Sequence, residues 1–161
     1  MRKKANKEEL YNLISDRNFG IFSKEEQEKI KKGKIIIIGQ GCVGELATVV
    51  AARVGVGNIT VVDRDILQWS NFNRNPLARV KYVGKPKVEN IVEMIKESNP
   101  TIKIKGIKKM LTEKNAKKIL LGHDIVLNLV DDMVARVIVH RAAKKLGLPC
   151  VTMSGAPKYR E

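Results

Sequence analysis

Residues 34–44, KIIIIGQGCVG, decide the fold of this 161-residue chain. The run of four isoleucines is continuous and β-branched, which is typical of a strand buried on both faces of a parallel sheet. It leads directly into three glycines and then into small residues at 45–54, which predict a helix. A second strand is predicted at 58–63. Together these segments predict one βαβ unit.

The rest of the chain continues this alternation of helices and strands. The predicted helices are 86–97, 113–121 and 133–146, and the predicted strands are 102–107, 124–130 and 149–153. This order predicts an α/β fold, a Rossmann-like doubly wound and mainly parallel sheet with right-handed crossovers. A long stretch at 64–84 lacks clear periodicity, and loops of that length inside a domain are usually functional.

The first 33 residues predict an N-terminal helical segment. Apolar residues at helical spacing predict a helix at 8–15, and Ser23 with Glu26 forms a capping box that opens a second helix. We therefore expect residues 1–33 to form this segment and residues 34–161 to form the sheet domain.

The composition excludes several classes of protein. Hydrophobic residues make up 43% of the chain and charged residues 30%, a balance that is typical of soluble globular proteins. Without an apolar run of membrane-spanning length or a signal peptide, the sequence predicts a cytoplasmic protein with no membrane partner. Cys42 and Cys150 are far apart and outside any CxxC pair, which argues against a disulfide or a zinc site.

The charge is unusual, because 31 Lys and Arg residues against 17 Asp and Glu residues give a net charge of +14. Two interpretations are open: an anionic partner, or lysine-rich helix faces that are merely solvated. An aromatic content of only 4% is poor material for stacking nucleic-acid bases.

The three glycines form a GxGxxG motif between the first strand and its helix, and Asp63 ends the next strand. Glycines let the backbone approach a phosphate, the helix N-terminus offers free N–H groups, and an acid at this place can accept hydrogen bonds from ribose hydroxyls. The motif is not a Walker A loop, because Glu45 and Leu46 follow its last glycine. The alternative is a glycine-rich turn that only packs the helix against the strand.

Further motifs follow in a fixed order. They are Gly55-Val56-Gly57, Val62-Asp63-x-Asp65, Ser70-Asn71-x-Asn73-Arg74, Gly84-x-x-Lys87, Asn99-Pro100 and Val130-Asp131-Asp132. With GxGxxG, this set resembles the ThiF/MoeB/HesA family from about residue 17 to residue 157. These proteins are relatives of the ubiquitin-activating enzymes, and they adenylate the C-terminal glycine of ubiquitin-like sulfur carriers.

The resemblance implies a role for individual residues. The implied ATP-binding residues are Gly39, Gly41, Gly44, Asp63, Asp65, Asn71, Asn73, Arg74, Lys87 and Arg17. Among them, Gly41 would lie against the phosphates, Asp63 would hold the ribose, and Arg74 and Lys87 would be catalytic cations at the triphosphate. Asp131 would be the third catalytic residue and the Mg²⁺ ligand. Arg17 would reach the ATP of the neighbouring subunit in a homodimer.

The chemistry of adenylation needs such groups. A carboxylate attacks the α-phosphorus and pyrophosphate leaves, so cations must neutralise the charge on the leaving group. Structural interpretations stay open for each residue. Arg74 and Lys87 can be surface cations, Asp132 can cap the next helix, and Arg17 can pair with Asp16.

The chain departs from the family pattern at Cys42, where a third glycine is usual, at Asn75, where the family has Gln, and at Asp132, where it has Asn. These changes bear on substrate choice and efficiency more than on nucleotide binding. In the family, the crossover segment, the catalytic cysteine and the zinc CxxC pairs lie beyond the position that matches Glu161. We therefore expect any activity of these residues to stop at the acyl-adenylate.

The expected function is ATP-dependent adenylation of the C-terminal glycine of a ubiquitin-like sulfur carrier that ends in Gly-Gly, with ATP and Mg²⁺ as cofactors. One alternative is a tRNA threonylcarbamoyladenosine dehydratase-like enzyme, with tRNA as partner, which the basic charge favours. Another is a non-catalytic nucleotide-binding module. The Asn-x-Asn-Arg and Gly-x-x-Lys motifs argue against a third, an NAD-dependent oxidoreductase.

Overall fold

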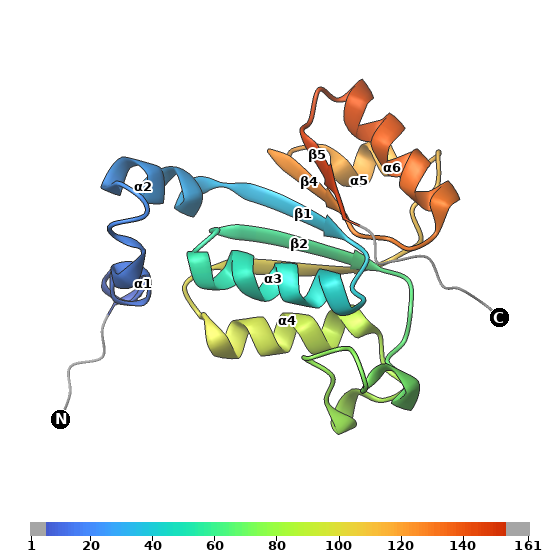
Figure 1. Cartoon of the computed structure of the whole chain (residues 1–161), viewed down its shortest axis with the longest axis horizontal. Coiled ribbons are helices and arrows are strands. Elements are labelled where there is room, and N and C mark those ends of the chain that lie inside the picture. The colour runs from blue at the N-terminus through green and yellow to red at the C-terminus, as the bar shows by residue number, and fades with distance from the viewer. Residues whose placement is uncertain (1–5, 154–161) are drawn as a thin grey trace.

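A five-stranded parallel sheet forms the centre of the molecule (Figure 1). We analysed a computed structural model, which describes residues 6–153. The strands are β1 (Lys34–Ile38), β2 (Asn58–Asp63), β3 (Lys103–Lys108), β4 (Ile125–Asn128) and β5 (Cys150–Thr152). Their order is β3-β2-β1-β4-β5, and every neighbouring pair is parallel. The predicted α/β, doubly wound and mainly parallel fold is confirmed.

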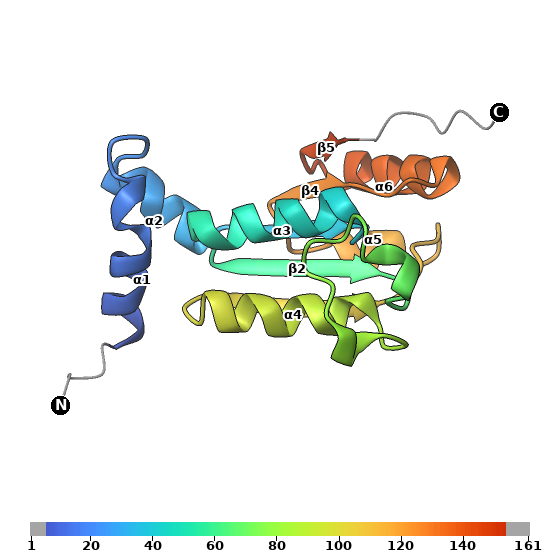
Figure 2. The ribbon, with the colours of Figure 1, turned by 60° about the horizontal axis from the view of Figure 1, so that its bottom comes forward.

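Four helices cover the two faces of this sheet. They are α3 (Cys42–Val54), α4 (Lys87–Ser98), α5 (Ala116–Leu120) and α6 (Met133–Lys145), whereas α1 (Lys7–Ser15) and α2 (Lys24–Lys32) lie beyond its end (Figure 1 and Figure 2). One core cluster joins α3 and α4 to the sheet, and a second joins α5 and α6 to its other face. Within residues 6–153, none of these helices has the length and apolar character needed to cross a membrane.

The four isoleucines of β1 divide between the two cores. Successive side chains of a strand point to opposite faces. Ile35 and Ile37 accordingly belong to the cluster of α3 and α4, and Ile36 and Ile38 to the cluster of α5 and α6. All four are buried. This double burial explains why the run is continuously apolar rather than alternating.

Most predicted element bounds agree with the structure to within one residue, and three elements differ by more. The helix predicted at 45–54 begins at Cys42, because Gly41 is its N-cap. The helix predicted at 113–121 is shorter, spanning Ala116–Leu120. The strand predicted at 124–130 ends at Asn128, and the next residue, Leu129, still donates its backbone N–H to the carbonyl of Ile38 at 2.8 Å. Residues 1–5 and 154–161 of the two predicted segments lie outside the described residues.

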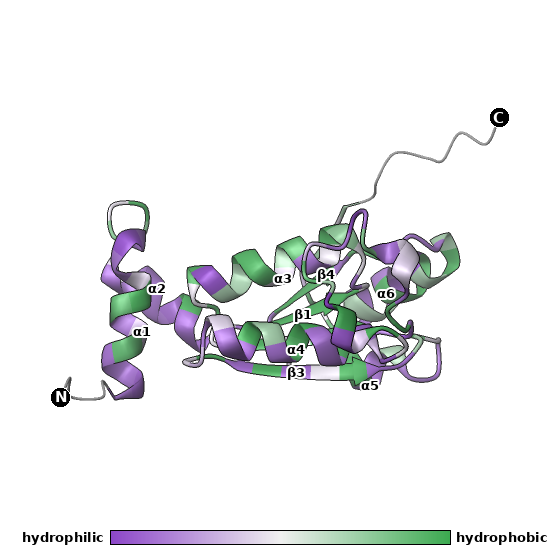
Figure 3. Cartoon of the chain, turned by 90° about the horizontal axis from the view of Figure 1, so that it is seen from below, coloured by the Kyte–Doolittle hydropathy of each residue, from purple (hydrophilic) through white to green (hydrophobic). Residues whose placement is uncertain are grey.

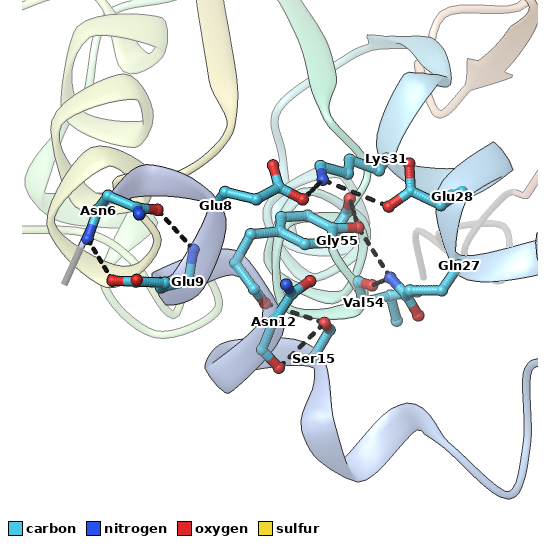
Figure 4. Close-up of polar contacts among 11 residues, drawn as sticks. Asn6, Glu8, Glu9, Asn12, Ser15, Gln27, Glu28, Lys31, Val54 and Gly55 are labelled. Atoms are coloured by element: carbon cyan, nitrogen blue, oxygen red, sulfur yellow. Dashed lines mark hydrogen bonds and ion pairs between the residues drawn. The ribbon is translucent and has the colours of Figure 1, made fainter. Parts of the chain in front are cut away.

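The N-terminal helices α1 and α2 pack against the C-terminal end of α3 through buried polar groups (Figure 4). The Tyr11 hydroxyl donates to the Gly55 carbonyl at 2.8 Å. Gln27 Nε2 donates to the Tyr11 hydroxyl at 2.8 Å and to the Val54 carbonyl at 3.0 Å. The last carbonyls of a helix have no partner within it. The N-terminal segment therefore supplies the partners that α3 lacks at this end.

We expect Tyr11→Phe to lower the free energy of unfolding by about 1–3 kcal/mol, because it leaves the buried Gly55 carbonyl without its donor. Urea denaturation measures this change. Tyr82→Phe is the matched control, since the Tyr82 hydroxyl makes no hydrogen bond within residues 6–153 and its ring is retained. Equal stability of the two variants would contradict the role assigned to the Tyr11 hydroxyl.

Candidate nucleotide site

The glycine loop joins the carboxyl end of β1 to the N-terminus of α3. The Gly39 N–H donates to the Val62 carbonyl at 2.8 Å, which fixes the start of the loop against β2. Gly41 is the N-cap of α3 and has no side chain that could cap the first turn. The backbone N–H groups at this helix end are therefore available to an anion.

The three positions of the motif are occupied by glycine for different physical reasons. Gly39 has a φ of 90°, and a Cβ there would lie 2.8 Å from the Leu129 carbonyl oxygen. A Cβ at Gly44 would lie 1.9 Å from the Gly39 carbonyl oxygen. Packing alone thus demands glycine at both positions. A Cβ at Gly41 would meet no atom within 4 Å, so this glycine leaves open space beside the N-terminus of α3.

Asp63, at the end of β2, ties the glycine loop to the segment that follows β2. Its Oδ2 accepts a hydrogen bond from the Gln40 N–H at 2.6 Å, and its Oδ1 accepts one from the Asp65 N–H at 2.7 Å. Burial raises the pKa of the Asp63 carboxyl, and the two backbone N–H groups act against this rise. Each oxygen keeps a second lone pair, with which a hydroxyl group could be held.

Lys87 is the first residue of α4, and its side chain is directed into the site. Its Nζ lies 3.4 Å from Asp65 Oδ2, and its side chain is only 9% exposed. Burial raises the pKa values of Asp63 and Glu45, and the charge of Lys87 acts against both rises. The Lys87 backbone N–H donates to the Asp65 carbonyl at 3.0 Å, and Asp65 is linked through Asp63 to the glycine loop. The alternative interpretation of Lys87 as a surface cation is wrong.

Most polar side chains of the turn at residues 70–75 form hydrogen bonds within the turn or with the residues next to it. Arg74 Nη1 donates to the Ser70 carbonyl at 2.7 Å and to Asn73 Oδ1 at 2.9 Å, and both side chains are exposed. Asn71 is buried, and its Oδ1 accepts from the Gln68 N–H at 2.9 Å. The Arg74 guanidinium has further donors that these two bonds do not use.

The segment after β4 brings Asp131 beside the glycine loop. A Cβ on Gly39 would lie 2.9 Å from the backbone nitrogen of Val130, so the two loops are in contact and Asp131 follows at once. The Asp131 side chain is exposed and makes no hydrogen bond within the described range. Asp132 instead caps α6, because its Oδ1 accepts from the Ala135 N–H at 2.7 Å. The capping interpretation of Asp132 is confirmed.

Arg17 does not join the other predicted site residues. It lies in a short turn after α1, and its neighbour Asn18 donates to the Val54 carbonyl at the C-terminal end of α3. The glycine loop is at the opposite end of this helix, roughly 20 Å away for 13 residues at 1.5 Å each. The side chain of Arg17 is 98% exposed and lies 3.8 Å from Asp16. Figure 1 and Figure 2 both show this turn far from the segment that follows β2.

Sequence reasoning missed Glu45, which connects the first turn of α3 to the turn at residues 70–75 and to Leu77. Its fully buried carboxylate accepts from Asn75 Nδ2 at 2.9 Å and from the Leu77 N–H at 2.8 Å. Burial raises the pKa of Glu45. Asn75 Nδ2 also reaches the Gln40 carbonyl at 3.3 Å, so the residue that replaces the usual Gln anchors the turn to the glycine loop. An acid in a helix of small and apolar residues was the signal available in the sequence.

The carboxyl edge of the sheet thus gathers an open helix N-terminus, the cations Lys87 and Arg74, and the carboxylates of Asp63, Asp65 and Asp131, with Glu45 buried behind them. This arrangement can hold a phosphate-bearing ligand and a hydroxyl-bearing ring next to it. Between residues 6 and 153, no three His, Cys, Asp or Glu side chains are grouped so that they could hold a metal ion by themselves. Outside the site, the ring nitrogens of His123 are hydrogen-bonded to the Leu120 carbonyl and Thr60 Oγ1, so this side chain links α5 to β2.

Comparison with known proteins agrees with this geometry. The model of the ThiF family matches residues 15–157. The adenylyltransferase and sulfurtransferase uba4 of Aspergillus niger is 34% identical over 128 residues, which are 80% of this chain and 27% of that protein. The sulfur carrier protein adenylyltransferase of Thermus thermophilus is 32% identical over 127 residues, 79% of this chain and 47% of that protein. The chain therefore spans less than half of either relative.

The fold is also found in solved structures. The E. coli tRNA N6-threonylcarbamoyladenosine dehydratase TcdA, in complex with AMP, superposes with a TM-score of 0.89 at 23% identity. The alignment covers 98% of this chain and 65% of that one. At this identity the likeness establishes the shared fold.

Gly41→Ala and Gly44→Ala separate nucleotide binding from packing. We expect Gly44→Ala to lower the free energy of unfolding by about 3 kcal/mol, because its Cβ collides with the Gly39 carbonyl. Gly41→Ala should change it by no more than about 1 kcal/mol. Its methyl group would, however, occupy the space beside the helix N-terminus and weaken ATP binding by on the order of tenfold or more. Calorimetric ATP titration is the measurement, and unchanged affinity in Gly41→Ala would place the phosphates elsewhere.

Proposed function

The chain belongs to the ThiF family, and on that premise we propose that it adenylates the C-terminal glycine carboxylate of a ubiquitin-like sulfur carrier. ATP is consumed and pyrophosphate is released. The observation that carries this proposal is the open N-terminus of α3 beside Gly41, with the buried amine of Lys87 near the same loop. The similarity to proteins named adenylyltransferases supports it.

The residues of the site suit the steps of this reaction. A carboxylate oxygen of the carrier attacks the α-phosphorus, and the bond from the α-phosphorus to the bridging oxygen breaks as pyrophosphate leaves. Lys87 and Arg74 neutralise the charge on the leaving group, and Asp63 accepts hydrogen bonds from the ribose hydroxyls. No protein nucleophile is required, because the carrier carboxylate supplies the attacking oxygen.

Mg²⁺ suits the site as a companion of the triphosphate. Such ions are commonly held by one or two carboxylates together with substrate phosphates. Asp131 fits this use, because its exposed carboxylate has no hydrogen-bond partner within the described residues. Bound there, the ion would polarise phosphate oxygens.

Arg74→Ala and Lys87→Ala are each expected to lower carrier-dependent exchange of pyrophosphate into ATP by on the order of 100-fold or more, because each removes a preorganised charge donor. Exchange of labelled pyrophosphate, measured with a carrier that ends in Gly-Gly, is the assay. Arg53→Ala is the matched control, since Arg53 is exposed in the last turn of α3, at the end remote from the glycine loop. Near-normal exchange in either site variant would refute its assigned role.

We also propose a homodimer in which Arg17 of one protomer serves the site of the other. Arg17 is exposed and lies at the end of α3 remote from its own site, which suits it to contact another molecule. The groove between α1 and α2 is partly apolar, and Leu13 and Phe19 are exposed at it.

A mixture of Arg17→Ala and Lys87→Ala protomers tests this arrangement. A mixed dimer contains one site with both Arg17 and Lys87 intact, so mixing is expected to restore part of the pyrophosphate exchange that each variant has lost. The control mixture combines Lys87→Ala protomers with protomers that carry both Arg74→Ala and Arg17→Ala. In such a mixed dimer, every site lacks at least one of the three side chains. Recovery that is no greater than in the control would mean that Arg17 acts within its own chain or not at all.

tRNA is the second candidate substrate, and the net charge of +14 is what favours it. In that case the site would activate an acyl group of a modified nucleoside with the same ATP chemistry. Exchange that depends on threonylcarbamoyladenosine-modified tRNA and not on a Gly-Gly carrier would replace the first proposal with this one.

A further inference from the structure

One corner of the sheet, at the amino ends of β1, β2 and β3, is left polar on the face that carries α5 and α6. The strand register places Lys34, Asn58 and Lys103 in one row and Thr60 beside Lys105 in the next. Alternate side chains of a strand share a face. These residues therefore share the face of Ile36 and Val62, which pack in the α5 and α6 core. Figure 3 shows the matching alternation of hydrophilic and hydrophobic residues along β3.

A recess of about 210 Å³ opens at this corner. Its polar lining consists of Lys34, Asn58, Thr60, Lys103, Lys105 and His123. The wall at His123 is fixed, because one ring nitrogen lies 3.0 Å from the Leu120 carbonyl oxygen and the other 2.9 Å from Thr60 Oγ1. The wall of the recess at His123 is therefore formed by side chains that are held within the protein.

The charge of this recess is unbalanced. None of its three lysines forms an ion pair within residues 6–153, and the three lie around one recess. The Asp124 carboxylate, next to His123, accepts a hydrogen bond from the Lys34 backbone N–H at 2.8 Å and pairs with no lysine amine in that range. A solvent-exposed cluster of unpaired ammonium groups attracts anions.

Protection of an edge strand is the simpler explanation for exposed lysines, because charges on an edge discourage pairing with other chains. It accounts for Lys103 and Lys105, which lie on the edge strand β3. It does not account for Lys34, which lies on the central strand β1. Asn58 and Thr60 on β2 have partners within the protein, namely the Gly33 carbonyl at 3.2 Å and a ring nitrogen of His123 at 2.9 Å. The lysines thus lie on both the edge strand β3 and the central strand β1 around one recess, which protection of the edge alone does not explain.

We propose that this recess binds the phosphate backbone of a single-stranded nucleic acid. Lys103 and Lys105 are two residues apart on one strand, about 7 Å, so each ammonium group can meet a separate phosphate. Lysine binds phosphate as a point charge from many directions, whereas bidentate recognition of carboxylates favours arginine, and none lines the recess. No Phe, Tyr or Trp side chain lines it, and both ring nitrogens of His123 are engaged within the protein, so we expect contact with the phosphate backbone that is independent of base sequence.

The recess lies at the edge of the sheet opposite to the nucleotide site. Lys34, Asn58 and Lys103 are the first residues of their strands, whereas the glycine loop and Asp63 follow the carboxyl ends. A bound strand would therefore leave the ATP site open. The inference does not rest on the proposed adenylation reaction, and it gives part of the excess positive charge a location.

The test compares two triple variants of equal charge in the full chain. Lys34→Ala, Lys103→Ala, Lys105→Ala removes the recess, and Lys29→Ala, Lys96→Ala, Lys144→Ala removes exposed lysines from α2, α4 and α6. Fluorescence anisotropy with a labelled single-stranded oligouridine measures the dependence of log Kobs on log salt concentration. Each lost phosphate contact reduces the magnitude of this slope by about 0.7. We therefore expect the magnitude to fall by about 2 in the recess variant and to change little in the control variant.

Equal slopes in the two triple variants would show that binding is a diffuse effect of net charge and would overturn the proposal. Absence of oligouridine binding by the unaltered chain at low salt would overturn it as well. Tighter binding of a polyglutamate peptide of equal charge would assign the recess to acidic protein instead. ATP affinity, measured on the same variants, is expected to stay unchanged, which separates this site from the nucleotide site.

Discussion

The close packing of the first turn of α3 against the end of β1 is the constraint on which the rest of the candidate site depends. The carbonyl oxygen of Gly39 lies where a side chain at position 44 would begin, so only glycine permits this approach. The contact aims the N-terminus of α3 at the carboxyl edge of the sheet. Asp63 and the Glu45–Asn75 pair then hold the neighbouring segments against the same loop. The candidate anion site is thus a consequence of how one helix meets one strand.

The two ends of α3 differ in whether their free backbone groups have hydrogen-bond partners. At its C-terminus, side chains of the N-terminal segment satisfy the Val54 and Gly55 carbonyls. At its N-terminus, Gly41 provides no cap, and the N–H groups stay available. Because a helix carries partial positive charge at its N-terminus, the open end attracts an anion. The N-terminal segment therefore stabilises the helix that presents the site. Arg17, which belongs to this segment, lies at the end of α3 remote from the glycine loop.

The fold could be predicted almost entirely from the sequence. Four isoleucines before a GxGxxG motif indicate a strand buried on both faces, and the structure confirms β1 and β2 at their predicted bounds. The site was partly predictable, since the positions of Gly39, Asp63 and Asp131 follow from the ends of parallel strands. The roles of Glu45 and Asn75 could not be predicted, because they depend on a contact between residues 30 apart in sequence. The orientation of Arg74 onto its own turn is likewise a property of local packing.

Transfer of AMP to the carrier tests the central claim most directly. The chain is incubated with ATP labelled at the α-phosphate and with a ubiquitin-like carrier that ends in Gly-Gly, and the carrier is then analysed by rapid acid quench and mass spectrometry. The account predicts a carrier acyl-adenylate that forms with the free C-terminal carboxylate and does not form when that carboxylate is amidated. Binding of ATP without any adenylated carrier would contradict it and would leave a nucleotide-binding module.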